Sequence, residues 1–309
     1  MNPTCPICGA SSEELYKAGR NKILSSLNGF FGTEFSPSII KADYAIRKCN
    51  SCTLEFADPL LPGDNEFYEA LSAHEGYYPH FRDEYRIVSD EILKTKGAAA
   101  KVLDIGCGSG DFLQLLKNEN FTNACGIDAT EASVASCIAK GLTAYRTRIE
   151  DFGQGPFDAI VSFHCLEHVD NPVEFIQLAL GKLSPGGTLY ISTPYSPQTH
   201  EYGWFHPLNH PPHHLLRLNE KSYRALAEKT NSDITFINFN TISPRSLFRT
   251  SFSFAVYGQN IPGSAMKLGF KMLARPMLAL HLWKKIKNRE IINGKIAGNE
   301  ILALFRKKN

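Results

Sequence analysis

The feature that most constrains the fold is a glycine-rich turn between a short apolar run and an amphipathic segment. The run at 101–106 is typical of a buried strand, the turn contains Gly106, Gly108 and Gly110, and residues 110–118 have the apolar spacing of a helix. Glycines let the backbone approach a ligand where a Cβ would collide, and the helix start offers free N–H groups. The motif predicts a ligand site in an α/β protein.

The glycine spacing argues against one large class of ligand. A dinucleotide site has the pattern G-x-G-x-x-G, whereas Asp111 stands here where the third glycine is needed. Asp104 adds a carboxylate at the end of the strand, which suits a cationic ligand better than a diphosphate. The sequence therefore argues against a dehydrogenase.

Strand-like and helix-like segments alternate along the rest of the chain. Strands are expected at 101–106, 123–128, 142–146, 157–163, 187–193, 233–238 and 300–305, and helices at 83–94, 110–118, 130–140, 172–182 and 219–229. This alternation predicts an α/β fold with a doubly wound, Rossmann-like sheet. Ligands bind beyond the carboxyl ends of such strands, so Gly106, Asp128, Ile149 and His164 are expected around one cleft.

Several motifs, in their order along the chain, resemble those of the class I S-adenosylmethionine-dependent methyltransferases. The stretch 102–110 resembles the family's first motif, Asp128 its ribose-binding acid, 148–151 the loop beside the adenine, and 183–189 the turn into the fifth strand. The resemblance implies a seven-stranded sheet and S-adenosylmethionine as methyl donor. The donor-binding residues that it implies are Asp104, Gly106, Cys107, Gly108, Gly110, Asp128, Ala129, Ile149, Glu150 and Phe163.

Four of the eight cysteines form two C-x-x-C pairs, Cys5 with Cys8 and Cys49 with Cys52. Four thiolates from two tight turns are the set that structural zinc prefers, and disulfides are the alternative. Methyltransferases of small-molecule and sugar pathways carry a similar zinc-binding module. We expect this module at 1–60, a helical lid or linker at 61–97 with Tyr77 or Tyr78 near the donor, and the methyltransferase domain at 98–309.

Histidines gather in two places. His164 ends the fourth strand, and a proline-rich loop carries Trp204, His206, His210, His213 and His214. Related sugar C-methylating enzymes place a Glu-His or His-His pair in this loop, which implies His214 as general base, with His213 and His210 orienting the acceptor and His164 contacting donor or acceptor. A second metal site and a hydrogen-bonded loop are the alternatives.

The string His164-Cys165-Leu166-Glu167-His168 also fits the H-x-x-E-H pattern of some zinc peptidases. It begins at a strand end rather than lying on one helix, and its neighbours are the methyltransferase-like motifs. We therefore expect His168 to be a structural hydrogen-bonding group.

Charge and hydropathy limit the partners and the location. The net charge of +2 gives no global signal for nucleic acid, and no apolar run approaches the ~18 residues of a membrane span. With no signal peptide visible, a cytoplasmic protein is expected. The basic, amphipathic stretch 266–286 contains Pro276, so two helices are expected there. They would belong to a helical insertion (244–295) that covers the sheet or the mouth of the active site, or that contacts the inner membrane surface.

These patterns predict a methyltransferase with a small-molecule acceptor. The family resemblance implies a sugar, nucleotide-sugar or glycolipid precursor that is O- or C-methylated with a histidine base. An RNA- or ribosome-directed methyltransferase and a non-catalytic, donor-binding partner subunit are the alternatives. The sequence argues against the RNA-directed alternative. Enzymes that methylate base amines carry an Asn/Asp-Pro-Pro-Tyr/Phe tetrapeptide after the fourth strand, whereas residues 163–166 of this chain are Phe-His-Cys-Leu.

Overall fold

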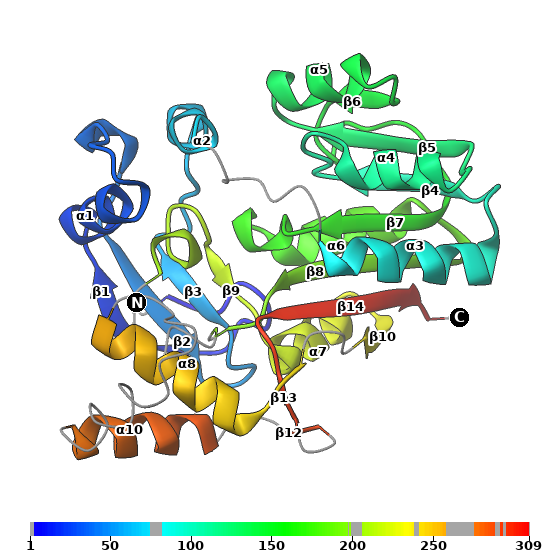
Figure 1. Cartoon of the computed structure of the whole chain (residues 1–309). Helices are drawn as coiled ribbons and strands as arrows, with labels where there is room; N and C mark the ends of the chain where they lie inside the picture. Colours follow the sequence, from blue (N-terminus) through cyan, green and yellow to red (C-terminus); the bar gives the residue numbers. More distant parts are fainter. Residues whose placement is uncertain are drawn as a thin grey trace.

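The chain is built around one mixed sheet. The computed structural model describes residues 3–74, 82–196, 198, 206–237, 241–257, 275–287, 291–292 and 295–308. The sheet has seven strands in the order β10-β14-β8-β7-β4-β5-β6 (Figure 1). Its strands are β4 (Lys101–Ile105), β5 (Asn123–Asp128), β6 (Ala144–Arg146), β7 (Phe157–Phe163), β8 (Leu183–Pro194), β10 (Ser232–Ile237) and β14 (Glu300–Lys307).

The strand order confirms the predicted Rossmann-like fold. Five neighbouring strands, β8-β7-β4-β5-β6, are parallel, and β14 runs antiparallel to both β8 and β10. The order reverses at β4, which lies between β5 and β7. The carboxyl end of β4 is therefore the switch point at which such sheets bind ligands.

Helices cover both faces because successive strand residues alternate between them. Val102 packs in one cluster with α3 (Asp83–Lys96) and α4 (Asp111–Asn118), while Leu103 packs in another with α6 (Pro172–Gly181) and α7 (Glu220–Lys229). A further helix, α5 (Glu131–Ala139), packs beside α4 through Cys137. Burying both faces fixes the register of the strands.

The N-terminal part forms a second, four-stranded sheet in the order β1-β2-β3-β9. Three of its strands and a helix come from the first 60 residues: β1 (Ser12–Ala18), α1 (Arg20–Phe31), β2 (Tyr44–Cys49) and β3 (Glu55–Asp58). The fourth strand, β9 (Leu216–Arg217), comes from the loop after β8, and Figure 1 shows it beside β3. This N-terminal module also shares one hydrophobic cluster with α6 and α7. The module and the seven-stranded sheet are therefore packed against each other.

The remaining elements connect or flank these sheets. They are α2 (Asn65–Ser72), the short 3-10 turns η1 (Pro37–Ile39), η2 (Leu166–His168) and η3 (Pro207–Asn209), the helices α8 (Pro244–Tyr257) and α10 (Pro276–Lys287), and the strands β11 (Thr241–Ile242), β12 (Ile291–Ile292) and β13 (Lys295–Ala297). The helices α8 and α10 pack together through Phe252 and Leu282. Tyr77, Tyr78, Trp204 and the start of the predicted amphipathic stretch lie outside the described residues.

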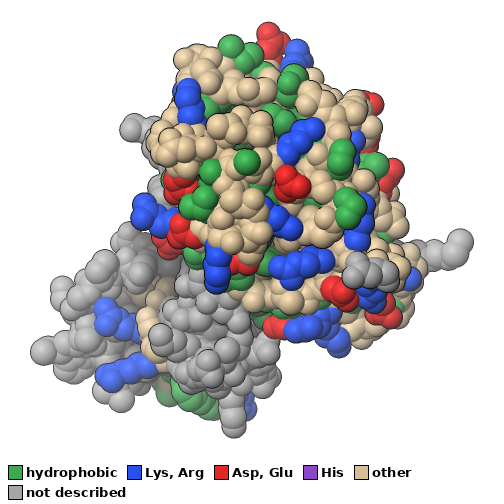
Figure 2. All heavy atoms as spheres, turned by 90° about the vertical axis from the view of Figure 1, so that its right-hand side faces the viewer, with side chains coloured by type: hydrophobic (Ala, Val, Ile, Leu, Met, Phe, Trp, Pro, Cys, Tyr) green, Lys and Arg blue, Asp and Glu red, His purple; other side chains and the backbone are tan. Residues whose placement is uncertain are grey.

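Two surface properties bear on partners. Figure 2 shows acidic and basic side chains interspersed over the face opposite the N-terminal module, without a patch of one sign. Within the described ranges, every helix is too short or too polar to cross a bilayer.

Candidate functional site

The glycine turn joins β4 to α4 and has one open side. Gly108 has φ +51°, its N–H donates to Asp128 Oδ2 at 3.0 Å, and apart from its chain neighbours no described residue lies within 4 Å of the place where a Cβ would stand. Gly110 has φ +82°, and a Cβ there would lie 2.8 Å from Cys137 Sγ. Gly110 therefore allows α4 and α5 to pack closely, while Gly108 leaves backbone accessible to a ligand.

Two carboxylates end the adjacent strands β4 and β5. Asp104 is 2 % exposed, and burial together with the nearby Asp128 raises its pKa to about 8. Asp128 is half-buried and its Oδ1 accepts hydrogen bonds from the N–H and the hydroxyl of Thr130, at 2.9 and 2.8 Å. A ligand with a positive charge would stabilise the ionised form of Asp104. The pair therefore fits the cationic amino-acid end and the ribose of S-adenosylmethionine.

The other predicted donor residues divide by burial. Cys107 and Ile149 are buried, Ala129 and Glu150 are exposed. Phe163 packs in the core, with its ring 4.8 Å from that of Tyr85 and 4.9 Å from that of Phe112. Phe163 therefore supports the end of β7 from within the core.

His164 is a half-buried cation, with its side chain 13 % exposed, between two buried acids. Its backbone has φ +51°, its Nε2 lies 2.9 Å from Glu84 Oε1, and its Nδ1 lies 3.4 Å from Glu167 Oε1. Burial lowers the pKa of His164, but the interactions with Glu167 and Glu84 outweigh it and raise the pKa to about 9. His164 is therefore protonated at neutral pH, which makes it a positioning group rather than a base.

Three other histidines meet in what we call the histidine cluster: His168, His213 and His214. A ring nitrogen from each lies within 4.8 Å of the others, and His213 and His214 are each 8 % exposed. Burial lowers the pKa of all three, and the neighbouring histidines lower those of His213 and His214 further. The cluster is therefore neutral at pH 7.

The cluster is held by oxygen acceptors. His168 Nδ1 lies 2.5 Å from the carbonyl oxygen of His213, and His213 Nδ1 lies 2.8 Å from that of Leu208. His214 Nδ1 lies 2.9 Å from Asn209 Oδ1. These contacts fix the ring orientations of three residues that come from two separate loops.

Glu167 borders the cluster and is almost fully buried. Its side chain is 1 % exposed, its Oε1 lies 3.8 Å from His214 Nε2, and neither carboxylate oxygen accepts a hydrogen bond from a described residue. Burying a carboxylate without a donor is costly, so its charge must be offset by nearby cations. His164 supplies one of them.

His210 is directed toward the N-terminal module. Its Nδ1 lies 2.7 Å from the carbonyl oxygen of His206, and its Nε2 lies 2.6 Å from the hydroxyl of Tyr16 in β1. The contact with Tyr16 links the loop after β8 to the first sheet. The structure thus brings His213 and His214 together with His168, and places His210 apart from them.

The geometry does not form the zinc-peptidase arrangement. His164 is bound to Glu84, while His168 belongs to the histidine cluster, and the segment between them is the short turn η2. Metal-binding H-E-x-x-H-type motifs need both imidazoles to face one ion from one helix. The H-x-x-E-H string therefore has another role here.

One loop connects the glycine turn with the histidine cluster. A Cβ at Gly106 would lie 3.1 Å from Cys165 Sγ, so the loop after β7 lies directly against the turn. Two residues further on, Glu167 faces His214 and its carbonyl oxygen accepts a hydrogen bond from Leu215 N at 2.8 Å. A donor on the turn and an acceptor at the cluster would thus contact the same short loop.

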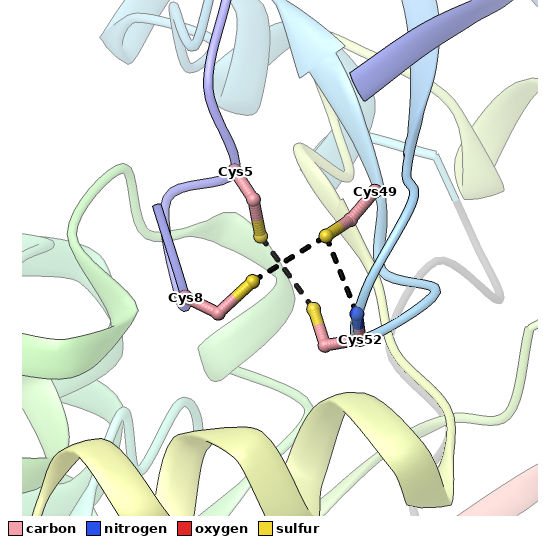
Figure 3. Close-up of side chains that lie close together, drawn as sticks. All are labelled: Cys5, Cys8, Cys49 and Cys52. Carbon is pink, nitrogen blue, oxygen red and sulfur yellow. Dashed lines mark hydrogen bonds between the residues drawn. The ribbon is translucent and has the colours of Figure 1, made fainter. Parts of the chain in front are cut away.

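The four N-terminal cysteines converge in the module (Figure 3). Their sulfur atoms lie within 4.8 Å of one another; the Cys5–Cys52 and Cys8–Cys49 pairs are 3.5 and 3.4 Å apart. These distances are far beyond an S–S bond of about 2.05 Å, which excludes the disulfide alternative in this structure. They approach the sulfur separations of a tetrahedral zinc site with Zn–S of about 2.3 Å.

The backbone prepares these sulfurs for a metal. Gly9 and Thr53, each directly after a C-x-x-C pair, have φ +74° and +60° and close the two turns. The N–H groups of Ser51 and Cys52 both donate to Cys49 Sγ at 3.3 Å. Hydrogen bonding to Cys52 lowers the pKa of Cys5 to about 5, whereas burial raises that of Cys8. The four residues therefore fit a structural zinc ion.

Sequence reasoning did not find Glu84, Asn209 or Tyr68 as members of the site. Tyr68 lies with its hydroxyl 3.2 Å from His168 Nδ1. Glu84 did leave a signal, because it stands four residues before Val88 on the buried stripe of α3, where a charged side chain needs a partner.

Several known proteins are similar to parts of this chain. A family model described as a methyltransferase domain matches residues 78–235. The mitochondrial ubiquinone biosynthesis O-methyltransferase of Dictyostelium discoideum is 31% identical over 110 residues, 30% of this chain and 34% of that protein. The ubiquinone biosynthesis O-methyltransferase of Actinobacillus pleuropneumoniae serotype 7 is 38% identical over 106 residues, 30% of this chain and 45% of that protein. The chain thus spans less than half the length of these relatives.

Two solved structures show a partial likeness to this chain. The plantazolicin methyltransferase BpumL in complex with SAH is 17% identical with a TM-score of 0.48, covering 79% of this chain and 91% of that one. The sugar N-methyltransferase KedS8 from Streptoalloteichus is 23% identical with a TM-score of 0.36, covering 42% of this chain and 54% of that one.

Proposed function

Because the chain belongs to the methyltransferase domain family, as a class I S-adenosylmethionine-dependent enzyme, we propose that it methylates a hydroxyl group of a small molecule. The observation that carries the proposal is the neutral, buried histidine cluster, which one loop joins to the glycine turn. Methyl transfer itself needs only positioning, whereas a hydroxyl acceptor must also lose a proton. The cluster is where that proton can leave.

The donor site lies at the carboxyl ends of β4 and β5. When bound, S-adenosylmethionine supplies an electrophilic methyl group on a cationic sulfur. Asp104 would hold the charged amino-acid end, Asp128 the ribose hydroxyls, and the open side of Gly108 would lie against the ligand. The turn residues Gly106, Cys107 and Gly110 shape this site, and we assign the adenine side to Ala129, Ile149 and Glu150, with Phe163 supporting the end of β7 from the core.

The acceptor side depends most on His214. This imidazole is neutral at pH 7, its Nδ1 is fixed by Asn209, and its Nε2 faces the Glu167 carboxylate. His213 completes the wall of the site, and His164 holds the loop in place as a cation between Glu84 and Glu167. His210, which was expected to orient the acceptor, would act through the loop that it anchors to Tyr16.

Two considerations define the acceptor class. The curated relatives are named O-methyltransferases, which favours oxygen over carbon as the methylated atom. The family resemblance of the cysteine module and the histidine loop favours a sugar, nucleotide-sugar or glycolipid precursor. We therefore propose a hydroxylated small molecule, with sugars as the first class to test.

The test is turnover of purified protein with a panel of nucleotide sugars, glycolipid precursors and dihydroxyphenols, measured as S-adenosylhomocysteine release. With an acceptor that is methylated, His214→Ala should lower kcat by roughly 10²–10⁴-fold while calorimetric affinity for S-adenosylhomocysteine stays unchanged. His281→Ala, in the exposed part of α10, is the matched control. Near-normal kcat in His214→Ala would remove the cluster from the reaction.

We also propose that Cys5, Cys8, Cys49 and Cys52 hold a structural zinc ion. A four-sulfur set leaves no open position, so the metal would stabilise the module rather than act in catalysis. The segment between the two C-x-x-C pairs is short, and metal ligation would contribute much of its folding energy.

A further inference from the structure

The three imidazoles of the histidine cluster share one tautomer. Each Nδ1 faces an oxygen: the carbonyls of His213 and Leu208 and the side-chain oxygen of Asn209. These oxygens only accept hydrogen bonds, so each Nδ1 carries the proton. The lone pair of each ring is therefore on Nε2.

The three rings lie close together, with His213 and His214 buried and His168 half-buried. One ring nitrogen from each histidine lies within 4.8 Å of the others, and the ring centroids are 4.5 to 4.8 Å apart. Lone pairs on closely packed rings repel one another, and a buried carboxylate, Glu167, lies 3.8 Å from His214 Nε2 without a hydrogen-bond donor among the described residues. Lone pairs and negative charge in one place favour a cation there.

The supporting contacts are those of a metal site. Histidine ligands in proteins usually donate their second ring N–H to a carbonyl or carboxylate, which orients the ring and raises the basicity of the binding nitrogen. All three histidines of the cluster are held in this way. Three imidazoles also match the ligand number of zinc sites that keep a fourth position open.

We propose that the Nε2 atoms of His168, His213 and His214 bind a divalent transition metal of the zinc class, with Glu167 next to the ion and a fourth position open to the acceptor. All-imidazole sites suit Zn²⁺, Cu²⁺, Ni²⁺ and Fe²⁺ better than Mg²⁺ or Ca²⁺. This site is separate from the four-cysteine set, so the chain would hold two metal ions with different ligands.

The role of the metal, though not its binding, rests on the proposed function. The acceptor oxygen takes the open position, and the metal lowers the pKa of its hydroxyl group. The proton passes to Glu167; the oxygen then bonds to the methyl carbon as the carbon–sulfur bond breaks, and that electron pair stays on sulfur. His214 would thus assist proton loss as a ligand, which differs from the direct base expected from the sequence.

The binding test is metal stoichiometry of tag-free, full-length protein. We expect two equivalents of zinc per chain in the wild-type protein and in His281→Ala, and one in His168→Ala and His214→Ala. After exchange into Co²⁺, the near-ultraviolet thiolate-to-cobalt absorption reports the four-cysteine site, so an unchanged band shows that each variant is folded. A single equivalent together with the full thiolate band in wild-type protein, even after dialysis against excess zinc, would overturn the proposal.

Glu167→Gln keeps all three imidazoles and covers the case in which an alanine variant does not fold. We expect it to keep two equivalents but to bind the second roughly 10–100-fold more weakly in chelator competition. Unchanged affinity would contradict a place for Glu167 beside the ion.

The two proposals fail in different ways. Two equivalents without methylation of any hydroxyl would refute the proposed function and keep the metal site. Methylation by a protein with one equivalent would keep the function and refute the metal site.

Discussion

At the residue scale, the site is distinguished by charged side chains that are almost fully buried. Glu84 and Glu167 are each 1 % exposed, and Asp104 is 2 % exposed. His164 balances the two glutamates, whereas nothing described at Asp104 supplies a full positive charge. Burial disfavours a charged side chain, so buried ionisable residues are often found where a ligand or a partner interacts with the charge. A substitution at each of these positions tests this.

His164→Gln should destabilise the fold by about 3–5 kcal/mol at pH 6, because it leaves two buried carboxylates without their cation. The pKa of His164 is raised from 6.5 to about 9 in the folded chain, so its stabilisation is complete below pH 6.5 and is lost as pH rises through 9. Denaturant unfolding at pH 6 and pH 9.5 should therefore show a smaller difference between wild type and variant at the higher pH. An equal difference at both pH values would contradict the assignment.

Asp104→Asn should stabilise the donor-free protein at pH 8 and weaken donor binding. The folded pKa of Asp104 is raised from 3.8 to about 8, so the carboxyl costs stability increasingly as pH rises across this interval. An amide removes that cost and also the charged contact, which should reduce calorimetric affinity for S-adenosylmethionine by roughly 10-fold or more. Ser109→Ala, in the same turn, serves as control. Unchanged affinity in Asp104→Asn would show that this acid does not contact the donor.

At the element scale, the strands of the large sheet were predictable, whereas the short β3–β9 pairing in the four-stranded sheet was not. The strands at 123–128 and 157–163 match their predicted bounds because the apolar periodicity spans the whole element. The strand β9 has two residues, and its partner Glu55 is 162 positions from Arg217, so no local pattern marks it. For the same reason, the sequence did not predict that His168 joins the histidine cluster, because His168 and His213 are 45 residues apart in the chain.

Cys49→Ser should release the zinc ion that we propose for the module and lower methyl transfer without abolishing donor binding. Backbone hydrogen bonds hold the histidine loop to the module, from Ala57 N in β3 to Leu215 O at 2.8 Å, and to the segment just after it, from Gly63 N to Pro212 O at 3.1 Å. Loss of structure in the module should therefore also displace the histidine cluster, whereas β4 and β5, which carry the donor site, should stay folded. Zinc content, turnover and donor calorimetry check this, with Cys125→Ser as the matched cysteine control. Full turnover in zinc-free Cys49→Ser would contradict it.

At the scale of the whole molecule, the helix pair at the C-terminal side presents apolar side chains outward. On α10, Met277 is 77 % exposed, Leu280 is 48 % exposed and Trp283 is 47 % exposed, while Leu282 packs against α8. The adjacent Lys284 and Lys285 are basic. Exposed Leu and Trp beside lysines are typical of helices that lie on anionic membrane surfaces, which is the role that the sequence left open.

The wild-type protein should therefore co-sediment with vesicles that contain phosphatidylglycerol, and Trp283→Ser should reduce the bound fraction several-fold. High salt should reduce it as well, because the lysine contribution is screened. Phe30→Ser replaces an equally exposed aromatic residue on α1 and is the control. If wild-type protein stays in the supernatant at low salt, α10 is not a membrane contact.

The pairing of Glu55 with Arg217 has a practical consequence for anyone who exchanges parts between such enzymes. Arg217 Nε lies 3.0 Å from Glu55 Oε2, and its Nη1 lies 2.7 Å from the carbonyl oxygen of Asn209. A chimaera that swaps residues 1–60 alone would join a foreign edge strand to the resident loop. Residues 206–217 must be transplanted with that segment, so acceptor preference and the cysteine-rich end of the chain should be inherited together.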